Sequence, residues 1–147
     1  MVATELLRKG LLQGLQVHGV DVAAAIEQRR YIPLDVAETL STFMVINLPD
    51  PVRFFKVGGD LITATARAAK GGHPPGAAGS GLAPVLWAQN KTDAAIQLER
   101  LWDEIAKTYE VDILCGYVLT GLQREQQGHI YERICAEHSA VRSQNGP

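Results

Sequence analysis

The chain has 147 residues, of which 46% are hydrophobic and 20% charged, and its formal net charge is −2. This length suits one domain with a real core, and the composition excludes a wholly disordered or fibrous chain. A nearly neutral charge gives no general electrostatic reason to expect binding to nucleic acid or to an anionic membrane.

Two cysteines, Cys115 and Cys135, are too few for a disulfide-built secreted fold. No apolar run reaches the length of a signal peptide or a membrane span. We therefore expect one cytoplasmic domain over residues 1–141, followed by a flexible tail over 142–147. We expect neither direct nucleic-acid binding nor membrane association.

The N-terminal segment, residues 4–19, is predicted to be an amphipathic helix with a face that can be buried. Its apolar residues recur at helical spacing, and they are Leu7, Leu11, Leu12 and Leu15. Asp21 is placed to cap a short second helix over 22–30. Residues 31–34 are extended in character, and Pro33 predicts an edge strand or a strand end.

The next segments are predicted to be two capped helices. Asp35 and Glu38 form a capping-box pattern that opens a helix over 36–45. Residues 47–51 are predicted to be a loop, in which Asp50 caps a helix over 52–70. The Gly58–Gly59 pair is expected to weaken that helix by about 1 kcal/mol per glycine relative to alanine.

Residues 71–90 contain no charged side chain. Residues 76–81 satisfy the spacing G-x-x-x-x-G, but Leu82 and Ala83 stand where a phosphate-binding loop needs Lys and Ser/Thr. Pro84 stands where the dinucleotide-binding pattern needs its third glycine. We therefore expect a turn over 71–81 and a buried segment over 82–89.

The second half of the chain predicts a helix, a strand and a helix. Asn90 and Asp93 open a helix with an apolar stripe made of Ala94, Leu98, Leu101, Trp102, Ile105 and Tyr109. Its polar side is made of Gln97, Arg100, Asp103, Glu104 and Lys107. Residues 111–119 are predicted to form a strand of a sheet that is covered on both faces. A last helix over 125–138 presents Ile130, Ile134 and Cys135 on one side. This order of elements predicts α/β layering.

Some residues leave two interpretations open. Glu99 is either a solvated flank of the apolar stripe or a carboxylate that supports a pocket beside Trp87 and Trp102. Four residues are of the types that bind metals, namely Cys115, Cys135, Glu137 and His138. They do not have the sequence spacing that is typical of metal ligands, so we expect them to pack in the core and expect no metal or cofactor. A Cys–His nucleophile has no support from spacing either. We expect His138 at a helix C-terminus.

Three segments, residues 19–45, 83–119 and 129–141, together resemble the MEDS domain, the sensory domain named for methanogens, methylotrophs and the regulator DcmR. The similarity is carried by L-E-x-L-W over 98–102, L-C-x-Y over 114–117 and I-C-A-E-H-S over 134–139. It extends from Val2 to about Val141, which is nearly the whole chain.

The resemblance implies a RecA-like layered α/β fold, with a mostly parallel sheet flanked by helices and no working phosphate-binding loop. It also implies a sensor of small molecules, hydrocarbon derivatives in the best-known cases, that occurs alone or beside DNA-binding or histidine-kinase modules. The candidate pocket residues are Trp87, Glu99, Trp102, Cys115 and Tyr117. Further family positions, structural or functional, are Leu98, Leu101, Leu114, Ile134, Cys135, Glu137, His138 and Ser139.

The chain departs from this family pattern in two places. Family members usually carry a Gly-Glu pair where this chain has Ser80–Gly81. The strand–helix–strand unit with which relatives begin is also missing, so we expect an N-terminally truncated fold. Loss of strands leaves an unpaired sheet edge and uncovered apolar surface, which predicts a homo-oligomer or marginal stability.

The resulting hypothesis is a non-catalytic sensory domain that binds a small molecule and signals, by a population shift, to a partner regulator or histidine kinase. The alternative is a truncated or vestigial protein-interaction module without ligand binding. A third hypothesis, that the chain is an enzyme with residual ATP hydrolysis, has the least support, because the Lys-Ser/Thr pair of a phosphate-binding loop is missing.

Overall fold

The computed structural model describes residues 1–68, 78–117 and 127–142. The chain is a mixed α/β structure in which helices predominate. The helices are α1 (Glu5–Val17), α2 (Val22–Glu27), α3 (Val36–Phe43), α4 (Pro51–Ala68), α5 (Leu82–Ala88), α6 (Thr92–Tyr109) and α8 (Gly128–Ala136). The strands are β1 (Val2–Ala3), β2 (Leu34–Asp35), β3 (Met44–Val45), β4 (Leu48–Pro49), β5 (Ala78–Ser80) and β6 (Ile113–Cys115).

The main sheet is parallel but small. Its strand order is β2-β1-β5-β6, and each strand has only two or three residues. Val2 pairs with Leu34 on one side and with Ser80 on the other, while Ser80 pairs with Cys115. Strands β3 and β4 form a separate antiparallel hairpin. The α/β class is therefore confirmed, whereas the sheet is much shorter than a fully layered fold would require.

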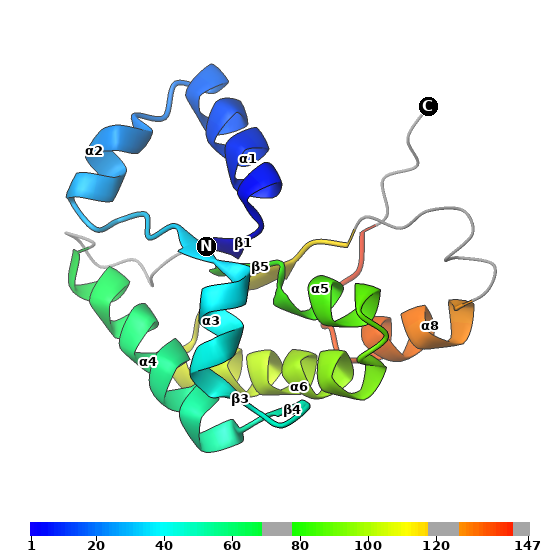
Figure 1. Cartoon of the computed structure of the whole chain (residues 1–147). Coiled ribbons are helices and arrows are strands. Elements are labelled where there is room, and N and C mark those ends of the chain that lie inside the picture. Colours follow the sequence, from blue (N-terminus) through cyan, green and yellow to red (C-terminus); the bar gives the residue numbers. More distant parts are fainter. Residues whose placement is uncertain (69–77, 118–126, 143–147) are drawn as a thin grey trace.

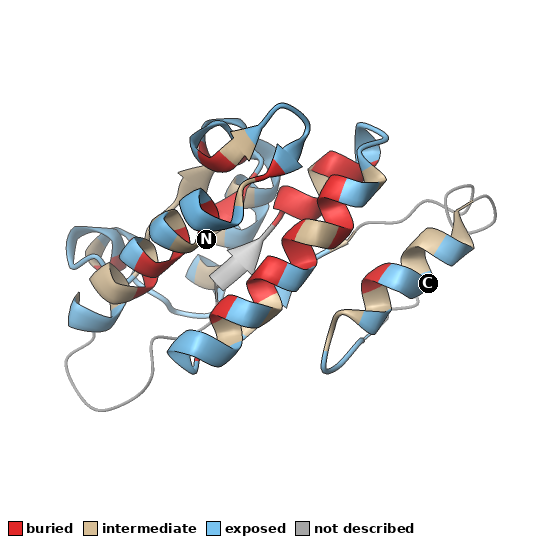
Figure 2. Cartoon of the chain, turned by 90° about the horizontal axis from the view of Figure 1, so that it is seen from below, coloured by how far each residue is buried: buried red, intermediate tan, exposed pale blue. Residues whose placement is uncertain are grey.

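The core lies between helices α3 to α6, below the sheet in Figure 1. Helices α5 and α6 make the most extensive contact with each other, and α4 packs against α6. Figure 2 shows the buried residues gathered along the sides on which the helices face one another. Apolar burial of this kind stabilises by about 25 cal/mol per Å². None of the helices in the described ranges combines the length and apolar character needed to cross a bilayer.

Several local predictions are confirmed. The carboxylate of Asp35 accepts from Ala37 N at 2.8 Å and Glu38 N at 3.1 Å, and so caps α3. Asp21 and Asp50 cap α2 and α4 in the same way. On α6 the predicted apolar stripe is buried except for Tyr109, which is exposed. Helix α6 begins at Thr92, however, because Asn90 adopts a left-handed conformation with φ of 60°.

The glycine pair in α4 has a packing role in addition to its local cost. A Cβ built on Gly58 would lie 2.5 Å from Cδ1 of the fully buried Ile105, and one built on Gly59 would meet the Tyr109 hydroxyl. The missing side chains therefore let α4 approach α6 closely. Helix α4 continues through the pair because this contact offsets the weak helix propensity of glycine.

We expect Gly58→Val to lower the free energy of unfolding by about 1–3 kcal/mol, because the added side chain overpacks the α4–α6 contact. The matched control is Gly14→Val in α1, where a new Cβ meets nothing within 4 Å and the change should be close to neutral. Urea denaturation of both variants checks this. Equal free energies of unfolding would show that the two helices do not approach closely at Gly58.

The predicted burial of the first helix is wrong. Helix α1 has no buried residue, and Leu7 and Leu11 are 47% and 40% exposed. The physical reason is that α1 has substantial contact only with α2 among the described elements. Figure 1 shows these two helices rising away from the sheet on the side opposite α4 and α6.

The residues that form strands differ from those predicted. Residues 44–45 and 48–49 form the β3–β4 hairpin in place of a helix end and a loop, and residues 78–80 form strand β5 in place of a turn. Strand β6 is shorter than the predicted 111–119 and lies at the edge of the sheet, so Leu114 is 68% exposed and not covered. The predictions for 71–77, 118–119 and most of the tail lie outside the described residues.

Candidate functional site

Glu99 is buried in the middle of helix α6, with only 2% of the residue exposed. Of its two interpretations, the solvated flank is wrong. Its Oε1 accepts a short hydrogen bond from the Tyr117 hydroxyl, and its Oε2 accepts from Cys115 Sγ at 2.9 Å. The same Oε2 lies 3.4 Å from His138 Nε2. A buried carboxylate persists only with such partners.

The partners of Glu99 come from separate parts of the chain. Cys115 is the last residue of β6 and Tyr117 lies two residues further along the chain, and both side chains donate to the carboxylate of Glu99. His138 comes directly after Glu137, the C-cap of α8, as the sequence predicted. Its Nδ1 lies 2.8 Å from the Ile134 carbonyl oxygen, which can only accept, so Nδ1 carries a proton. Nε2 is thereby directed at Glu99.

The electrostatics of this cluster keep the neighbours of Glu99 protonated. Burial raises the pKa of the Cys115 thiol far above its usual range, and the nearby charge of Glu99 raises it further. The pKa of Tyr117 is raised for the same reasons. The hydrogen bond to Glu99 raises the pKa of His138, which favours the imidazolium. A protonated Cys115 is a poor nucleophile, so the cluster by itself does not favour thiolate chemistry.

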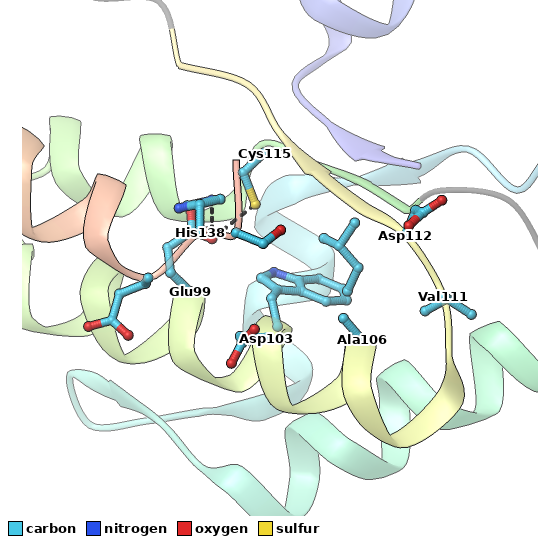
Figure 3. Close-up of a pocket in the computed structure, with 11 residues that line it drawn as sticks. Glu99, Asp103, Ala106, Val111, Asp112, Cys115 and His138 are labelled. Atoms are coloured by element: carbon cyan, nitrogen blue, oxygen red, sulfur yellow. Dashed lines mark hydrogen bonds and ion pairs between the residues drawn. The ribbon is translucent and has the colours of Figure 1, made fainter. Parts of the chain in front are cut away.

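A pocket of about 150 Å³ opens beside this cluster. Helix α6, strand β6 with the residues before it, and the segment after α8 form its walls (Figure 3). The lining residues are Glu99, Trp102, Asp103, Ala106, Val111, Asp112, Ile113, Cys115, Glu137, His138 and Ser139. Figure 3 shows Cys115 and His138 close together above α6, with Asp112 on the other side of the pocket.

Two buried indole N–H groups find no hydrogen-bond acceptor among the described residues, those of Trp87 and Trp102. A buried donor left without an acceptor costs about 1–3 kcal/mol. Trp102 lines the pocket, so a bound molecule could supply the acceptor. Trp87 does not line it and packs instead against the ring of Tyr117, at 5.9 Å between ring centroids.

The charged side chains around the pocket are mostly acidic. Asp103 is paired with Lys107 at 2.6 Å, and Glu137 is paired with Arg100 at 2.9 Å. Asp112 forms no ion pair with any residue in the described ranges. Together with the buried Glu99, these groups favour positive charge in the pocket.

The structure brings together most of the residues singled out from the sequence. Three of the five candidate pocket residues line the pocket, namely Glu99, Trp102 and Cys115, while Tyr117 reaches it only through Glu99. Of the other family positions, Glu137, His138 and Ser139 also line the pocket. The remainder do not line it: Leu98, Leu101 and Ile134 are core residues, Leu114 is exposed on the edge strand, and Cys135 is half-buried.

Sequence reasoning missed the far wall of the pocket, which is formed by Asp103, Ala106, Val111, Asp112 and Ile113. A signal was present for two of them. Asp103 and Ala106 follow Glu99 and Trp102 by one helical turn, so they share a face of α6 with them.

Comparison of the chain with protein-family models, with curated proteins and with solved structures finds no match.

Proposed function

We propose that this chain is a non-catalytic, cytoplasmic sensory domain of the MEDS type, with a RecA-like arrangement of layers, that binds a small molecule in the pocket beside Glu99. The proposal is supported by the convergence of the three sequence patterns that carry the resemblance. Glu99 belongs to the first pattern, Cys115 and Tyr117 to the second and His138 to the third, and all four meet in one cluster.

One observation carries the ligand-binding proposal: Trp102 lines the pocket, and its buried indole N–H has no hydrogen-bond partner among the described residues. It calls for a ligand with a hydrogen-bond acceptor. The volume of about 150 Å³ is well below the roughly 300–1,000 Å³ of sites for drug-sized molecules. The ligand class is therefore a compact uncharged molecule that has a polar oxygen as acceptor, such as a short alcohol or aldehyde.

The proposed signalling step depends on the three separate parts of the chain that form the pocket walls. A ligand that contacts α6, β6 and the segment after α8 favours the conformations in which these parts stay together. Such a population shift can be transmitted only to a protein that distinguishes the two conformations, which we propose to be a regulator or a histidine kinase.

A thermal-shift screen of short alcohols and aldehydes tests ligand binding on the full chain in chelator-containing buffer. A ligand at 100 times its Kd should raise Tm by about 5–10 °C, because it stabilises the folded state by about 2.7 kcal/mol. A screen without any shift would count against the sensor.

For a compound found in this way, we expect Trp102→Phe to weaken binding about 3- to 10-fold, since it removes one hydrogen-bond donor and keeps an aromatic ring. Trp87→Phe is the matched control, because the indole N–H of Trp87 is also buried without a partner in the described part of the chain, but Trp87 does not line the pocket. Calorimetric titration of both variants checks this. A Kd unchanged by Trp102→Phe, or weakened equally by both, would place the ligand elsewhere.

A second function, a protein-interaction module without ligand binding, is favoured by the exposed leucines of α1 and by the exposed Leu114 on edge strand β6. Its partner would be a second copy of the chain that pairs along this edge. A concentration-dependent dimer in light scattering, together with a ligand screen in which no compound raises Tm, would favour this function over the sensor.

A further inference from the structure

Three side chains of different ligand type converge beside the pocket. Oε2 of Glu99, Sγ of Cys115 and Nε2 of His138 all lie within 4.8 Å of one another. We propose that these three atoms bind one divalent transition-metal ion of the zinc class. This site goes beyond the proposed sensor function, because it does not depend on whether the pocket also takes an organic ligand.

The distances between the ligand atoms suit a tetrahedral ion. Zinc bonds of about 2.0–2.3 Å place neighbouring ligand atoms roughly 3.3–3.8 Å apart. Here Oε2 lies 2.9 Å from the Cys115 sulfur and 3.4 Å from the His138 nitrogen. Shifts of less than about 1 Å therefore bring the three atoms to zinc geometry. Sulfur and imidazole ligands favour zinc over magnesium or calcium, which prefer oxygen.

The surroundings orient each ligand atom toward the same point. The Ile134 carbonyl holds the proton on Nδ1 of His138, so Nε2, once it gives up its proton, is the nitrogen that binds the metal. The Tyr117 hydroxyl occupies Oε1 of Glu99, which leaves Oε2 facing the sulfur and the imidazole. Metal sites commonly use this kind of outer hydrogen bond to fix the direction of a ligand.

Binding of a metal ion requires the ligand atoms of the cluster to give up their protons. In the structure the Cys115 thiol donates its proton to a hydrogen bond with Oε2 of Glu99 at 2.9 Å, so this proton lies between two of the proposed ligand atoms. A divalent ion replaces these protons: the sulfur–hydrogen bond of Cys115 breaks and a sulfur–metal bond forms, Nε2 of the His138 imidazolium gives up its proton and binds the ion, and both protons leave to solvent. The carboxylate of Asp112, which has no ion pair with any described residue, adds further negative potential at the pocket.

All three ligand residues also line the pocket, so the fourth position of a tetrahedral ion faces it. Three protein ligands with one open position is the arrangement of zinc sites that exchange water for another molecule. A small oxygen or sulfur compound bound at this position would lie in the same pocket as the Trp102 indole N–H.

The test uses the full chain, freed of metal by a chelator that is then removed by buffer exchange. Titration with Zn²⁺ in a calorimeter should show one ion per chain with release of protons. Titration with Co²⁺ should produce the thiolate-to-metal absorption band and the strong visible bands of a tetrahedral site. Cys115→Ser and His138→Gln should each weaken binding by at least ~100-fold, since even outer-shell changes cost 10- to 100-fold. Cys115→Ser should also abolish the thiolate band.

Cys135→Ser and His129→Gln are the matched controls, because each removes the same chemical group outside the cluster. Both should keep the affinity and the spectrum. The inference is overturned if the unmodified chain takes up no stoichiometric Co²⁺, or if the thiolate band is lost in Cys135→Ser and kept in Cys115→Ser. Even if a variant fails to fold, the cobalt spectrum of the unmodified chain shows whether a tetrahedral thiolate site exists. Zinc titration contains no organic ligand and the ligand screen contains chelator, so either proposal can fail while the other stands.

Discussion

Replacement of Glu99 by alanine should lower the free energy of unfolding by about 3 kcal/mol, because three buried or half-buried donors lose their common acceptor. Tyr117, Cys115 and His138 would each point at the cavity that the carboxylate leaves. In a chain of this length such a loss corresponds to a fall in Tm of about 6–12 °C.

Urea denaturation in the presence of chelator measures this effect. Glu104→Ala on the exposed side of the same helix is the matched control and should change stability by less than about 0.5 kcal/mol. Glu99→Gln keeps an oxygen acceptor for Tyr117 but loses the negative charge opposite His138, so its cost should fall between the two. Equal stability of Glu99→Ala and Glu104→Ala would contradict the burial of this carboxylate.

The second large effect is expected at Phe54, which joins three helices. Its ring lies edge-to-face with Phe43 of α3 at 5.1 Å and with Trp102 of α6 at 4.8 Å, and it is 2% exposed. Phe54→Ala should lower the free energy of unfolding by about 3–5 kcal/mol through the lost apolar burial and the cavity. Since domains are stable by only about 5–15 kcal/mol, this variant is expected to be partly unfolded at 37 °C.

Phe55→Ala is the matched control for this effect. It removes the same side chain from the neighbouring position of α4, where the ring is only partly buried against the core. Its cost should be clearly smaller, about 1 kcal/mol. Denaturant titrations of the two variants compare them directly. Equal costs would show that Phe54 is not the residue at which α3, α4 and α6 meet.

Local patterns predicted the helices well because the relevant forces act within a few residues. The stripe of Leu98, Leu101 and Ile105 on α6 follows from helical spacing alone. The caps at Asp21, Asp35 and Asp50 need only a side-chain oxygen and the next turn of backbone.

The strands were harder to predict, since their limits depend on which neighbours pair. The apolar run 111–119 resembles a long buried strand, yet within its described part only 113–115 pair, against Ala78, Gly79 and Ser80 of β5. Nothing in a run of apolar residues indicates that its strand lies at a sheet edge. Residues 78–80 were likewise expected to be a turn because their glycine-rich composition is typical of loops.

The candidate site could be predicted only in its parts. Each partner of Glu99 was singled out from the sequence, but the contacts join residues far apart in the chain, such as Glu99 and Cys115, 16 residues apart. Spacing rules detect metal ligands on one element or one loop. A set made of one residue from a helix, one from a strand and one from a helix end has no such spacing, so the metal set that we considered from the sequence contained Cys135 and Glu137 and omitted Glu99.

The position of α1 has a consequence for how the chain loses its structure. Residues between β1 and β2 form an excursion that begins and ends at neighbouring strands, and its helices bury little. Few apolar contacts are lost when such a segment opens, so its opening requires much less free energy than global unfolding. The strands at its base can remain paired during this opening. We therefore expect the native state to include partially unfolded forms in which residues 5–33 lose order while the core around Phe54 and Trp102 stays intact.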